Sequence, residues 1–590
     1  MRCQGHARFS LAVTAGLVLG SLPGTSAAPY SNSTGPHCRY IPGDDRWPSH
    51  AEWKHLNQSV GGRLIQGKPL AQSCHALSYN VDECIGVQSQ WTQAPIFLDD
   101  PVNVMAPLWL NNSCSPFTGR DSSCSLGNIA SYAINVTSAA DIAAGLKFAK
   151  KKNIRLTVKN TGHDFIGRSA GGGSLALWTH NLKRISFLDY KSLHYTGPAV
   201  RLGAGVQAYE AYEAVAARGL RVTGGFCSTV GIAGGYVQGG GHGPLEGLYG
   251  LAADNTLEFE VVTADGRHLT VTPTRHSDLF WALNGGGGGT YAVVLSHTTR
   301  VHVDGPVAGA SLAFNNTDPD VYWAAIEAWH EHLLVLDDIV GFNSVFGISD
   351  VAFGLSFATL PGSDAAGITA ALAPFTNRLD DLGIEYTFSA TERPGFYEHY
   401  AYYTADLPFG NYPTTLLIGG RLIPRSAARP TNRAALVAAL RDVVAPSTDP
   451  SAPSYAVNGI ASDVTRAATH APNAVLPAWR NSLYWLNVVT DSDPFNASAA
   501  ALRPLQDGLN RRQDRVKAVT PGGGAYMSEA TFDNPDWKRD YYGVNYARLL
   551  AVKRRHDPDF LFYGPASVGS DHWVVAADGR LCRAGRGWDN

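Results

Sequence analysis

The stretch VKNTGHDFIGRSAGGG, from Val158 to Gly173, places His163 in a glycine-rich loop that continues the β-rich run IRLTVKN. A second loop, GGFCSTVGIAGGYVQGGGHG from Gly224 to Gly243, holds Cys227, and a third, NGGGGGTYAVV, begins at Asn284. Glycine runs let backbone N–H groups approach a ligand closely, and successive amides can form a nest for anions. Three such loops in one α/β section predict a site for a large, extended, phosphate-bearing ligand.

The standard nucleotide, metal and hydrolase motifs are missing. The sequence has no G-x-x-x-x-G-K-[ST], and no G-x-G-x-x-G follows a first strand with an acidic residue about twenty positions later, so neither a P-loop nor a Rossmann dinucleotide site is expected. H-E-x-x-H and C-x-x-C are absent, so we expect no metal site. G-x-S-x-G does not occur as a strand–turn–helix nucleophile elbow, which disfavours a hydrolase.

Residues 1–28 have the pattern of a secretory signal peptide. Arg2 and Arg8 precede the apolar run FSLAVTAGLVLGSL, and the small residues of GTSAAP predict cleavage near Ala27 or Ala28. A membrane anchor is the alternative, but the run is short for a bilayer span. We therefore expect a soluble, extracellular protein without membrane association. Sequons predict a glycoprotein and stand at Asn32, Asn57, Asn111, Asn135, Asn315 and Asn496.

Net charge and cysteine content narrow the class of protein further. The formal net charge is −3 over 590 residues with no long basic run, so we expect no nucleic-acid partner. We also expect a monomer that acts on a small molecule. Once Cys3 leaves with the signal peptide, seven cysteines remain, an odd number in an oxidising compartment. If Cys227 has another role, three disulfides are possible, although an inert buried thiol is the alternative for Cys227. Sequence does not fix the connectivity, but the pairings that we favour are Cys74–Cys84, Cys114–Cys124 and Cys38–Cys582.

The remaining chain divides into four segments and predicts an α+β fold. Residues 29–119 are rich in cysteine and lack long periodic segments, which predicts an irregular, disulfide-held region. Residues 120–304 show an α/β rhythm, with a helix capped by Ser138 and a hairpin that turns at Asp265–Gly266. Residues 305–520 mix helical and β patterns, typical of an antiparallel sheet covered by helices on one face. Residues 521–590 contain an amphipathic helix that ends before Asp557–Pro558.

Four blocks, in this order, resemble one protein family. VKNTGHD at 158–164 is similar to the flavin-binding signature of the vanillyl-alcohol oxidase and p-cresol methylhydroxylase superfamily, and GGFCSTVG at 224–231 resembles the cysteine loop of its berberine-bridge-enzyme-like branch. DLFWALNGGGGG at 278–289 and YYGVNYARLLAVKRRHDPDFLF at 541–562 match two further blocks. CRYIPGDDRWPSHAEWKHLN, near the start, is similar to secreted fungal isoamyl alcohol oxidase-like proteins. The resemblance implies a two-part FAD-binding domain of the p-cresol methylhydroxylase type, a separate substrate domain over the isoalloxazine, and a C-terminal segment that packs back on the FAD domain.

The resemblance implies a shared role for the two reactive side chains. In such relatives the histidine bonds to the flavin 8α-methyl and the cysteine to C6, which implies bicovalent FAD on His163 and Cys227, in agreement with the odd cysteine count. Val230 matches a position where valine tends to let O2 reach the flavin, which favours an oxidase. The motifs also imply pyrophosphate contacts at Asn160, Thr161, Gly162, Asp164 and Ser169, flavin lining by Val230, Gly231, Gly234, Gly235, Gly239, Gly240, His242, Asp254, Asn255 and Val262, and C-terminal contacts from Asn545 and Tyr546.

The sequence departs from the plant members of this family. Gly235 stands where many of them have histidine, His242 stands where an aromatic residue is common, and the C-terminal PFPHR segment is missing. We therefore do not transfer plant catalytic residues to this chain, and these departures weaken the case for a berberine-type ring closure.

The implied reaction is hydride transfer from an alcohol-type carbon to flavin N5, with reoxidation by O2 to H2O2, and it needs a base for the hydroxyl proton. GGGAYMSEATF at 522–532 has the pattern of a strand, which would put Tyr526 on one face and Glu529 on the other. We predict Tyr526 as an active-site phenol, with Glu529 as the alternative, although a core tyrosine is an equal competitor. FYEHYAYYTADLPFG at 396–410 offers further candidates in His399, Tyr402 and Tyr403.

Two classes of function stay open. The first is a secreted FAD oxidase of an alcohol, a sugar or a secondary-metabolite intermediate, including a dehydrogenase or cyclase of a biosynthetic pathway. The second is a secreted flavin-binding or storage protein with little turnover. Peroxide formation over a substrate panel would separate them.

Overall fold

The computed structural model describes residues 38–585, apart from 111–112, 405–406, 408–413, 450–451, 466–470, 494 and 496. The predicted signal peptide, Cys3 and the sequons at Asn32, Asn111 and Asn496 lie outside the described residues. Among the described helices, none combines the length and the apolar character that crossing a membrane requires.

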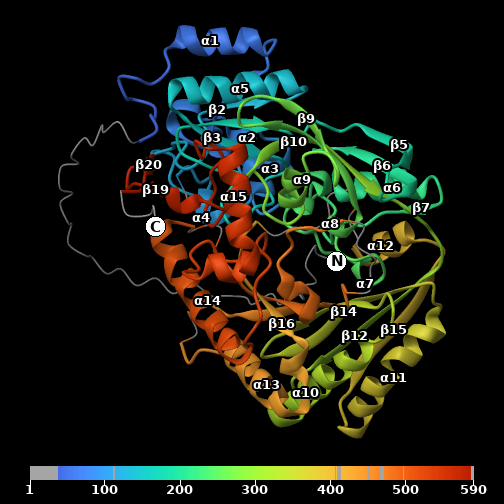
Figure 1. The fold of residues 1–590 in the computed structure, drawn as a ribbon. Helices are drawn as coiled ribbons and strands as arrows, with labels where there is room; N and C mark the ends of the chain where they lie inside the picture. Colours follow the sequence, from blue (N-terminus) through green and yellow to red (C-terminus); the bar gives the residue numbers. More distant parts are fainter. Residues whose placement is uncertain are drawn as a thin grey trace.

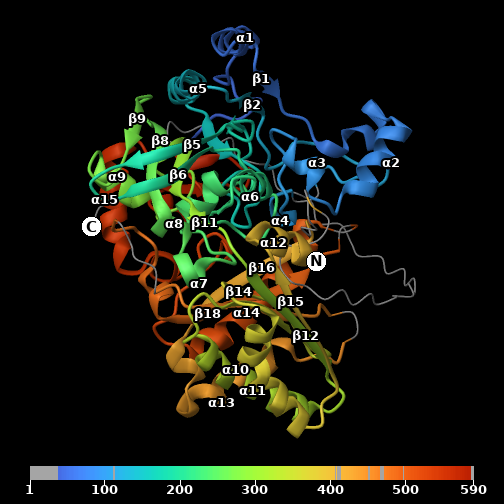
Figure 2. The same cartoon turned by 90° about the vertical axis from the view of Figure 1, so that its right-hand side faces the viewer.

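The N-terminal region is tied by disulfides but is more regular than predicted. The three pairings Cys38–Cys582, Cys74–Cys84 and Cys114–Cys124 are confirmed, and among the described cysteines only Cys227 lies outside them. Helices α1 (His50–Ser59) and α2 (Val81–Gln90) contradict the prediction of an irregular region. The sequence pattern missed α1 because it buries only Trp53 and Leu56, too few residues to display a helical period. Helix α1 lies along α5 at the top of the molecule (Figures 1 and 2).

Two sheets build the section that carries the glycine loops. The first has the order β1-β2-β4-β3, parallel except for the pairing of β1 with β2, and the second has the antiparallel order β5-β6-β10-β8-β9. The predicted N-cap at Ser138 and the hairpin at Asp265–Gly266 are both confirmed, and the structure adds a capping box between Ser138 and Asp141. The elements are β1 (Leu64–Gln66), β2 (Tyr132–Asn135), α5 (Ala139–Lys152), β3 (Arg155–Lys159), β4 (Ser174–Trp178), β5 (Ile185–Lys191), β6 (Thr196–Gly203), α6 (Ala208–Ala216), β7 (Leu220–Arg221), η3 (Ile232–Tyr236), β8 (Thr256–Thr263), β9 (His268–Val271), α9 (Ser277–Leu283), β10 (Ala292–Arg300) and β11 (His302–Val303).

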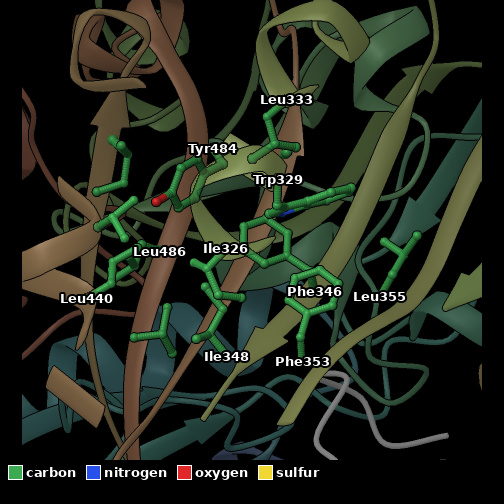
Figure 3. Close-up of a cluster of buried hydrophobic side chains, with 14 of the residues drawn as sticks. Ile326, Trp329, Leu333, Phe346, Ile348, Phe353, Leu355, Leu440, Tyr484 and Leu486 are labelled. Carbon is green, nitrogen blue, oxygen red and sulfur yellow. The ribbon is translucent and has the colours of Figure 1, made fainter. Parts of the chain in front are cut away.

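A seven-stranded antiparallel sheet fills the lower half of the molecule in Figure 1, with helices covering one of its faces. The strand order is β15-β12-β14-β13-β17-β18-β16, which confirms the predicted helix-covered antiparallel sheet. The helix-facing side chains form a large core around Trp329, Phe346 and Tyr484 (Figure 3). The elements are β12 (Val307–Asn315), α10 (Pro319–Leu336), β13 (Asn343–Ile348), β14 (Ala352–Pro361), α11 (Ala365–Asp381), β15 (Tyr386–Arg393), α12 (Phe396–Thr404), β16 (Leu416–Pro424), α13 (Pro430–Val444), β17 (Ala456–Ser462), β18 (Ser482–Asp491) and α14 (Ala499–Val519).

The C-terminal segment returns to the upper half, where α15 (Tyr546–His556) packs beside α9 (Figure 1). Helix α15 ends at His556, as predicted. The prediction of a strand over 522–532 is wrong, because this segment forms no ladder with another strand. The backbone N–H of Glu529 instead donates to the carbonyl of Tyr526. This turn breaks the two-residue period and brings Glu529 to the same side as Tyr526.

Candidate active site

The first glycine loop leaves β3 and is shaped by its own side chains. The Asp164 carboxylate accepts from the backbone N–H of Ser169 at 2.8 Å and from that of Ile166 at 3.2 Å. The Asn160 amide donates to the carbonyl of Ala204 at 2.7 Å. Gly162 has a φ of +85°, a conformation that side-chain-bearing residues rarely adopt. The loop is therefore preorganised around His163 before any ligand binds.

A hydrogen bond joins the first loop to the second. His163 Nε2 lies 2.8 Å from the Thr229 hydroxyl, two residues after the buried Cys227. Burial, helped by the charge of Lys159, lowers the pKa of His163 to about 3, so the imidazole is neutral at physiological pH. The loops also pack closely, because a Cβ on Gly231 would lie 2.1 Å from the Asn160 side-chain oxygen.

One cavity brings the three loops together, and it contains about 1540 Å³ of space that is partly open to solvent. Most of the predicted site residues line it. They are Asn160, Thr161, Gly162, His163, Asp164, Ser169, Cys227, Val230, Gly231, Gly234, Gly235 and His242 of the predicted cofactor set, and Tyr403, Tyr526 and Glu529 of the predicted catalytic set.

The known proteins that this chain resembles agree with this geometry. A family model described as "FAD binding domain" matches residues 130–272, and one described as "Berberine and berberine like" matches residues 525–569. The chain is 43% identical over 579 residues to the VAO-type flavoprotein oxidase VAO615 of Thermothelomyces thermophilus, covering 96% of this chain and 98% of the relative. It is also 41% identical over 570 residues to the bifunctional decalin synthase calF of Penicillium decumbens, covering 95% and 97%.

The chain belongs to the VAO-type, berberine-bridge-enzyme-like family of FAD-linked oxidoreductases.

Solved structures agree with this assignment. The crystal structure of the VAO-type flavoprotein MtVAO615 from Myceliophthora thermophila C1 matches with a TM-score of 0.88 and 42% identity, covering 93% of this chain and 100% of that one. A glucooligosaccharide oxidase from Acremonium strictum, described with 6-S-cysteinyl, 8α-N1-histidyl FAD, matches with a TM-score of 0.61 and 20% identity, over 75% of this chain and 92% of that one. The second match shows the shared fold alone. The protein is therefore an FAD-dependent oxidoreductase.

The cavity residues fit the FAD of this VAO-type family. The Asn160 Oδ1 and Gln238 Oε1 atoms are buried with no hydrogen-bond partner among the described residues, and such atoms need a ligand or water to satisfy them. Nothing lies within 4 Å of where a Cβ on the cavity-lining Gly235 would point. Loop glycines and unsatisfied polar atoms together provide close backbone approach and hydrogen bonding, as a dinucleotide requires.

A histidine and a carboxylate that are hydrogen-bonded to each other line the cavity in this VAO-type enzyme. His242 Nε2 lies 3.1 Å from Glu529 Oε1, and the indole N–H of Trp485 donates to Glu529 Oε2 at 3.1 Å. Burial alone would raise the pKa of Glu529, but His242 and Trp485 hold it below its ordinary value. Burial and the neighbouring Glu529 raise the pKa of Tyr526 well above its ordinary value. At neutral pH the carboxylate is therefore charged and the phenol protonated.

Several residues predicted to line the flavin lie outside the cavity lining and contact other parts of the protein. The Asp254 carboxylate accepts from Arg480 at 2.6 and 2.8 Å, and Asn255 donates to the carbonyls of Tyr249 and Leu251. Val262 is fully buried in the core between β8 and α5. None of these three residues lines the cavity. The family motif locates them near the flavin loops, but their side chains point to other partners.

The structure also shows where the other predicted site residues outside the cavity lining lie. Gly239 packs against Ser528, and Gly240 packs against Val475. Asn545 donates to the carbonyls of Ala474 and Val475, and the Tyr546 hydroxyl bonds to Asp571. His399 is buried and lies 2.9 Å from the Thr359 hydroxyl, and Tyr402 is 52% exposed. Neither of these two catalytic candidates on α12 reaches the cavity.

Sequence reasoning missed Arg168, Gln238 and Trp485. Arg168 lies inside the first loop and donates to the carbonyl of Met527 at 2.7 Å, so it ties that loop to the segment that carries Glu529. Gln238 donates to the carbonyl of Gly234 at 2.9 Å inside the second loop. Arg168 and Gln238 both belong to glycine loops that the sequence analysis had identified. A polar side chain within such a loop was therefore the sequence feature that could have pointed to each of them. No sequence pattern indicated Trp485, because its partner Glu529 lies 44 residues away in the chain.

Proposed function

We propose that this FAD-linked oxidoreductase is a secreted oxidase that holds FAD through both His163 and Cys227, oxidises an alcohol-type carbon, and uses O2 to form H2O2. The observation that carries the proposal is that His163, Cys227 and the charged Glu529 line one cavity. An attachment pair and a proton acceptor are the parts that such a reaction needs from the protein. The oxidase name of the 43% identical relative and the position of Val230 in the lining support the oxidase class.

The state of His163 suits attachment. A bond from imidazole nitrogen to carbon requires a free lone pair, and the low pKa of His163, about 3, keeps the ring neutral. Cys227 is buried and lies outside the three disulfides. The histidyl and cysteinyl linkage described for the Acremonium strictum oxidase is a precedent on the same fold.

The protein residues supply the proton chemistry. When bound, FAD accepts the hydride and passes the electrons to O2. Glu529 accepts the proton of the substrate hydroxyl, because it is charged at neutral pH and is held by His242 and Trp485. Tyr526 keeps its proton, so it orients the substrate by donating a hydrogen bond and is not the base. These proposed roles reverse the sequence-based prediction, in which Tyr526 was the first candidate and Glu529 the alternative.

The attachment is tested by acid precipitation and intact mass of the secreted protein. Wild type, His163→Ala and Cys227→Ala should each keep a flavin-sized mass in the precipitate, and the double variant should lose it. His268→Ala, an exposed imidazole on β9, is the matched control and should behave as wild type. Flavin that stays entirely in the wild-type supernatant would contradict bicovalent attachment. N-terminal sequencing of the secreted protein tests cleavage near Ala28.

A second function is favoured by one comparison. The relative named bifunctional decalin synthase suggests that a member of this family can act on a biosynthetic intermediate. A dehydrogenase of that kind would reduce an artificial electron acceptor faster than O2 with the same substrate. Peroxide formed in a one-to-one ratio with oxidised product supports the oxidase, and rapid acceptor reduction with little peroxide supports the alternative.

A further inference from the structure

The backbone that presents Cys227 is held by an unbroken run of hydrogen bonds. In the second glycine loop, each of the six carbonyls from residue 225 to residue 230 has a donor, and five of the donors lie outside the loop. Only the carbonyl of Cys227 has its donor within the loop, the backbone N–H of Val230 at 3.3 Å. This run fixes the chain that carries Cys227 against the cavity.

Three of the five outside donors come from the start of α6 and bind the carbonyls of residues 228–230. The backbone N–H groups of Ala208 and Tyr209 donate at 2.9 and 3.0 Å. The side-chain amide of Gln207 donates at 2.9 Å. The first N–H groups of a helix have no partner within the helix, so α6 supplies these donors without losing any of its own hydrogen bonds.

Two buried tyrosines supply the donors for the residues just before Cys227. The Tyr212 hydroxyl on α6 donates to the carbonyl of Gly225 at 2.8 Å. The Tyr400 hydroxyl on α12 donates to the carbonyl of Phe226, also at 2.8 Å. The two tyrosine rings pack edge to face with centroids 4.8 Å apart, and both side chains are buried. Because these two donors are side-chain groups, a substitution can remove each of them without changing the backbone.

The tyrosine pair joins two different parts of the chain. Tyr212 belongs to residues 120–304, which carry the glycine loops, whereas Tyr400 belongs to residues 305–520, which carry the seven-stranded sheet. Helices α6 and α12 lie side by side in both views (Figures 1 and 2) and share one hydrophobic core. Through Tyr400, the part of the chain that carries the sheet therefore contacts the backbone next to Cys227.

The contact of Tyr212 with the loop is tight and needs a protonated phenol. Burial, with a contribution from the neighbouring Cys227, raises the pKa of Tyr212 well above its ordinary value, so the hydroxyl keeps the proton that it donates. A Cβ on Gly224 would lie 2.5 Å from the hydroxyl oxygen of Tyr212. Loss of the hydroxyl would leave a buried carbonyl without its partner, which is unfavourable, so the loop would shift to satisfy it.

His163 does not depend on the tyrosine pair. Its Nε2 lies 2.8 Å from the hydroxyl of Thr229, whose carbonyl is held by Gln207. Asp164 shapes the first loop from within. Removal of a tyrosine hydroxyl should therefore displace Cys227 and leave His163 in place.

We propose that Tyr212 and Tyr400 are positioning residues for the bond between Cys227 and the flavin, and that they do not act on the bond from His163. This inference rests on the proposed bicovalent attachment. In the step, Cys227 releases its thiol proton and its sulfur bonds to C6, which loses its hydrogen as a proton. The two electrons left on the flavin pass to O2, which takes up two protons to form H2O2. Since a misplacement of about 1 Å can slow a reaction about 100-fold, the step depends on how the loop is held.

Peptide mapping of the flavin-loaded secreted protein tests this proposal. The denatured protein is alkylated without a reductant, so that the disulfides stay closed and Cys227 reacts only where it carries no flavin. After digestion, the peptides of His163 and Cys227 are quantified by mass. Each bond to FAD removes two hydrogen atoms from the combined mass. In wild type, the two peptides should be recovered joined through one FAD.

Tyr400→Phe and Tyr212→Phe each remove one hydroxyl and keep the ring. At the same time of harvest, the ratio of flavin-linked to alkylated Cys227 should fall at least tenfold in each variant, while His163 stays linked. If Tyr212→Phe is not secreted, Tyr400→Phe carries the test. Tyr322→Phe is the matched control and should match wild type, because the buried Tyr322 donates to a carbonyl at 2.9 Å in the helix-facing core, away from the cavity.

The outcomes separate this inference from the proposed function. If Cys227 is linked as fully in both tyrosine variants as in wild type, the inference is overturned and bicovalent attachment stands. Loss of both bonds together, or an equal loss in Tyr322→Phe, also overturns the inference, because the tyrosines would then support the fold in general. A wild-type protein in which Cys227 is alkylated would contradict bicovalent attachment itself, and this inference with it.

Discussion

Glu529 is the residue whose chemistry depends most on its contacts. His242 and Trp485 together hold its carboxylate in the charged form, with a pKa below the ordinary 4.5. We expect Glu529→Gln to keep the flavin and the fold but to lower kcat by about 100-fold or more, the range that removal of a general base costs. Steady-state peroxide formation measures the loss. Glu392→Gln, an exposed position on β15, is the control, and an unchanged kcat in Glu529→Gln would contradict the role of base.

Glu246 lies behind this pair and gives a prediction for stability. Its carboxylate accepts from the backbone N–H of Gly243 at 3.1 Å and from the Asn343 amide at 3.4 Å. Burial raises the pKa of Glu246 from 4.5 to about 7, against the opposing effect of His242. Between these two pH values the folded protein keeps a proton that the unfolded chain has lost. The free energy of unfolding should therefore fall as pH rises from about 4.5 to 7, by roughly 3 kcal/mol from this residue.

Glu246→Gln should remove that component of the pH dependence. Denaturant unfolding followed by circular dichroism at pH 5 and pH 8 would show a smaller loss of stability in the variant than in wild type. Glu213→Gln, an exposed residue of α6, is the control and should follow wild type. Parallel stability profiles for wild type and Glu246→Gln would show that Glu246 ionises normally in the folded protein.

Single residues also show how far the sequence could reach. Local motifs were enough to single out His163 and Cys227, which line the cavity, because the loop that presents each one is contiguous in the chain. The contact of Asp254 with Arg480 could not be predicted, because Arg480 lies 226 positions away and no pattern near Asp254 indicates it. Glu529 was ranked second to Tyr526, because only the fold reveals that His242, 287 positions away, holds the carboxylate charged.

At the scale of elements, the helices and strands with a strong hydrophobic period were predicted correctly. The segment 522–532 was predicted as a strand, and that prediction was wrong. Its alternation of apolar and polar residues is that of a strand, but a turn between Tyr526 and Glu529 overrides the alternation. The bulge at Ser356 in β14 was likewise not predicted, because one extra residue in a strand leaves no trace in the amino-acid composition. Patterns of period therefore predict regular elements, whereas turns and bulges depend on pairing across the fold.

The segment that carries Glu529 is positioned by its contact with the second glycine loop. A Cβ on Gly239 would lie 2.4 Å from the Ser528 hydroxyl oxygen and 3.4 Å from the Tyr526 ring. Gly239→Ala should therefore displace this segment and lower kcat about tenfold while the flavin stays bound. Gly239→Ala with Ser528→Ala should recover activity, because the next atom of Ser528 lies at 3.6 Å.

Peroxide assays and flavin absorbance measure both effects of the Gly239 variants. Gly86→Ala in α2 is the control, because nothing lies within 4 Å of the added Cβ. It should leave activity unchanged and stabilise the helix by about 0.5–1 kcal/mol. Equal activity in Gly239→Ala and wild type would show that the contact with Ser528 does not position Glu529.

At the scale of the whole molecule, the site lies where the glycine loops, the seven-stranded sheet and the C-terminal segment meet, so contacts between distant segments hold it. Asp254, next to the loops, is fully buried and is bound by Arg480, just before β18. Arg480→Met should lower the free energy of unfolding by about 3–5 kcal/mol, because it leaves the carboxylate buried without its counter-charge. Adding Asp254→Asn should restore part of this stability, since an amide carries no charge to desolvate. Chemical unfolding followed by circular dichroism and by flavin fluorescence measures both variants, and a double variant as unstable as Arg480→Met would show that the pair holds the molecule through shape and not through charge.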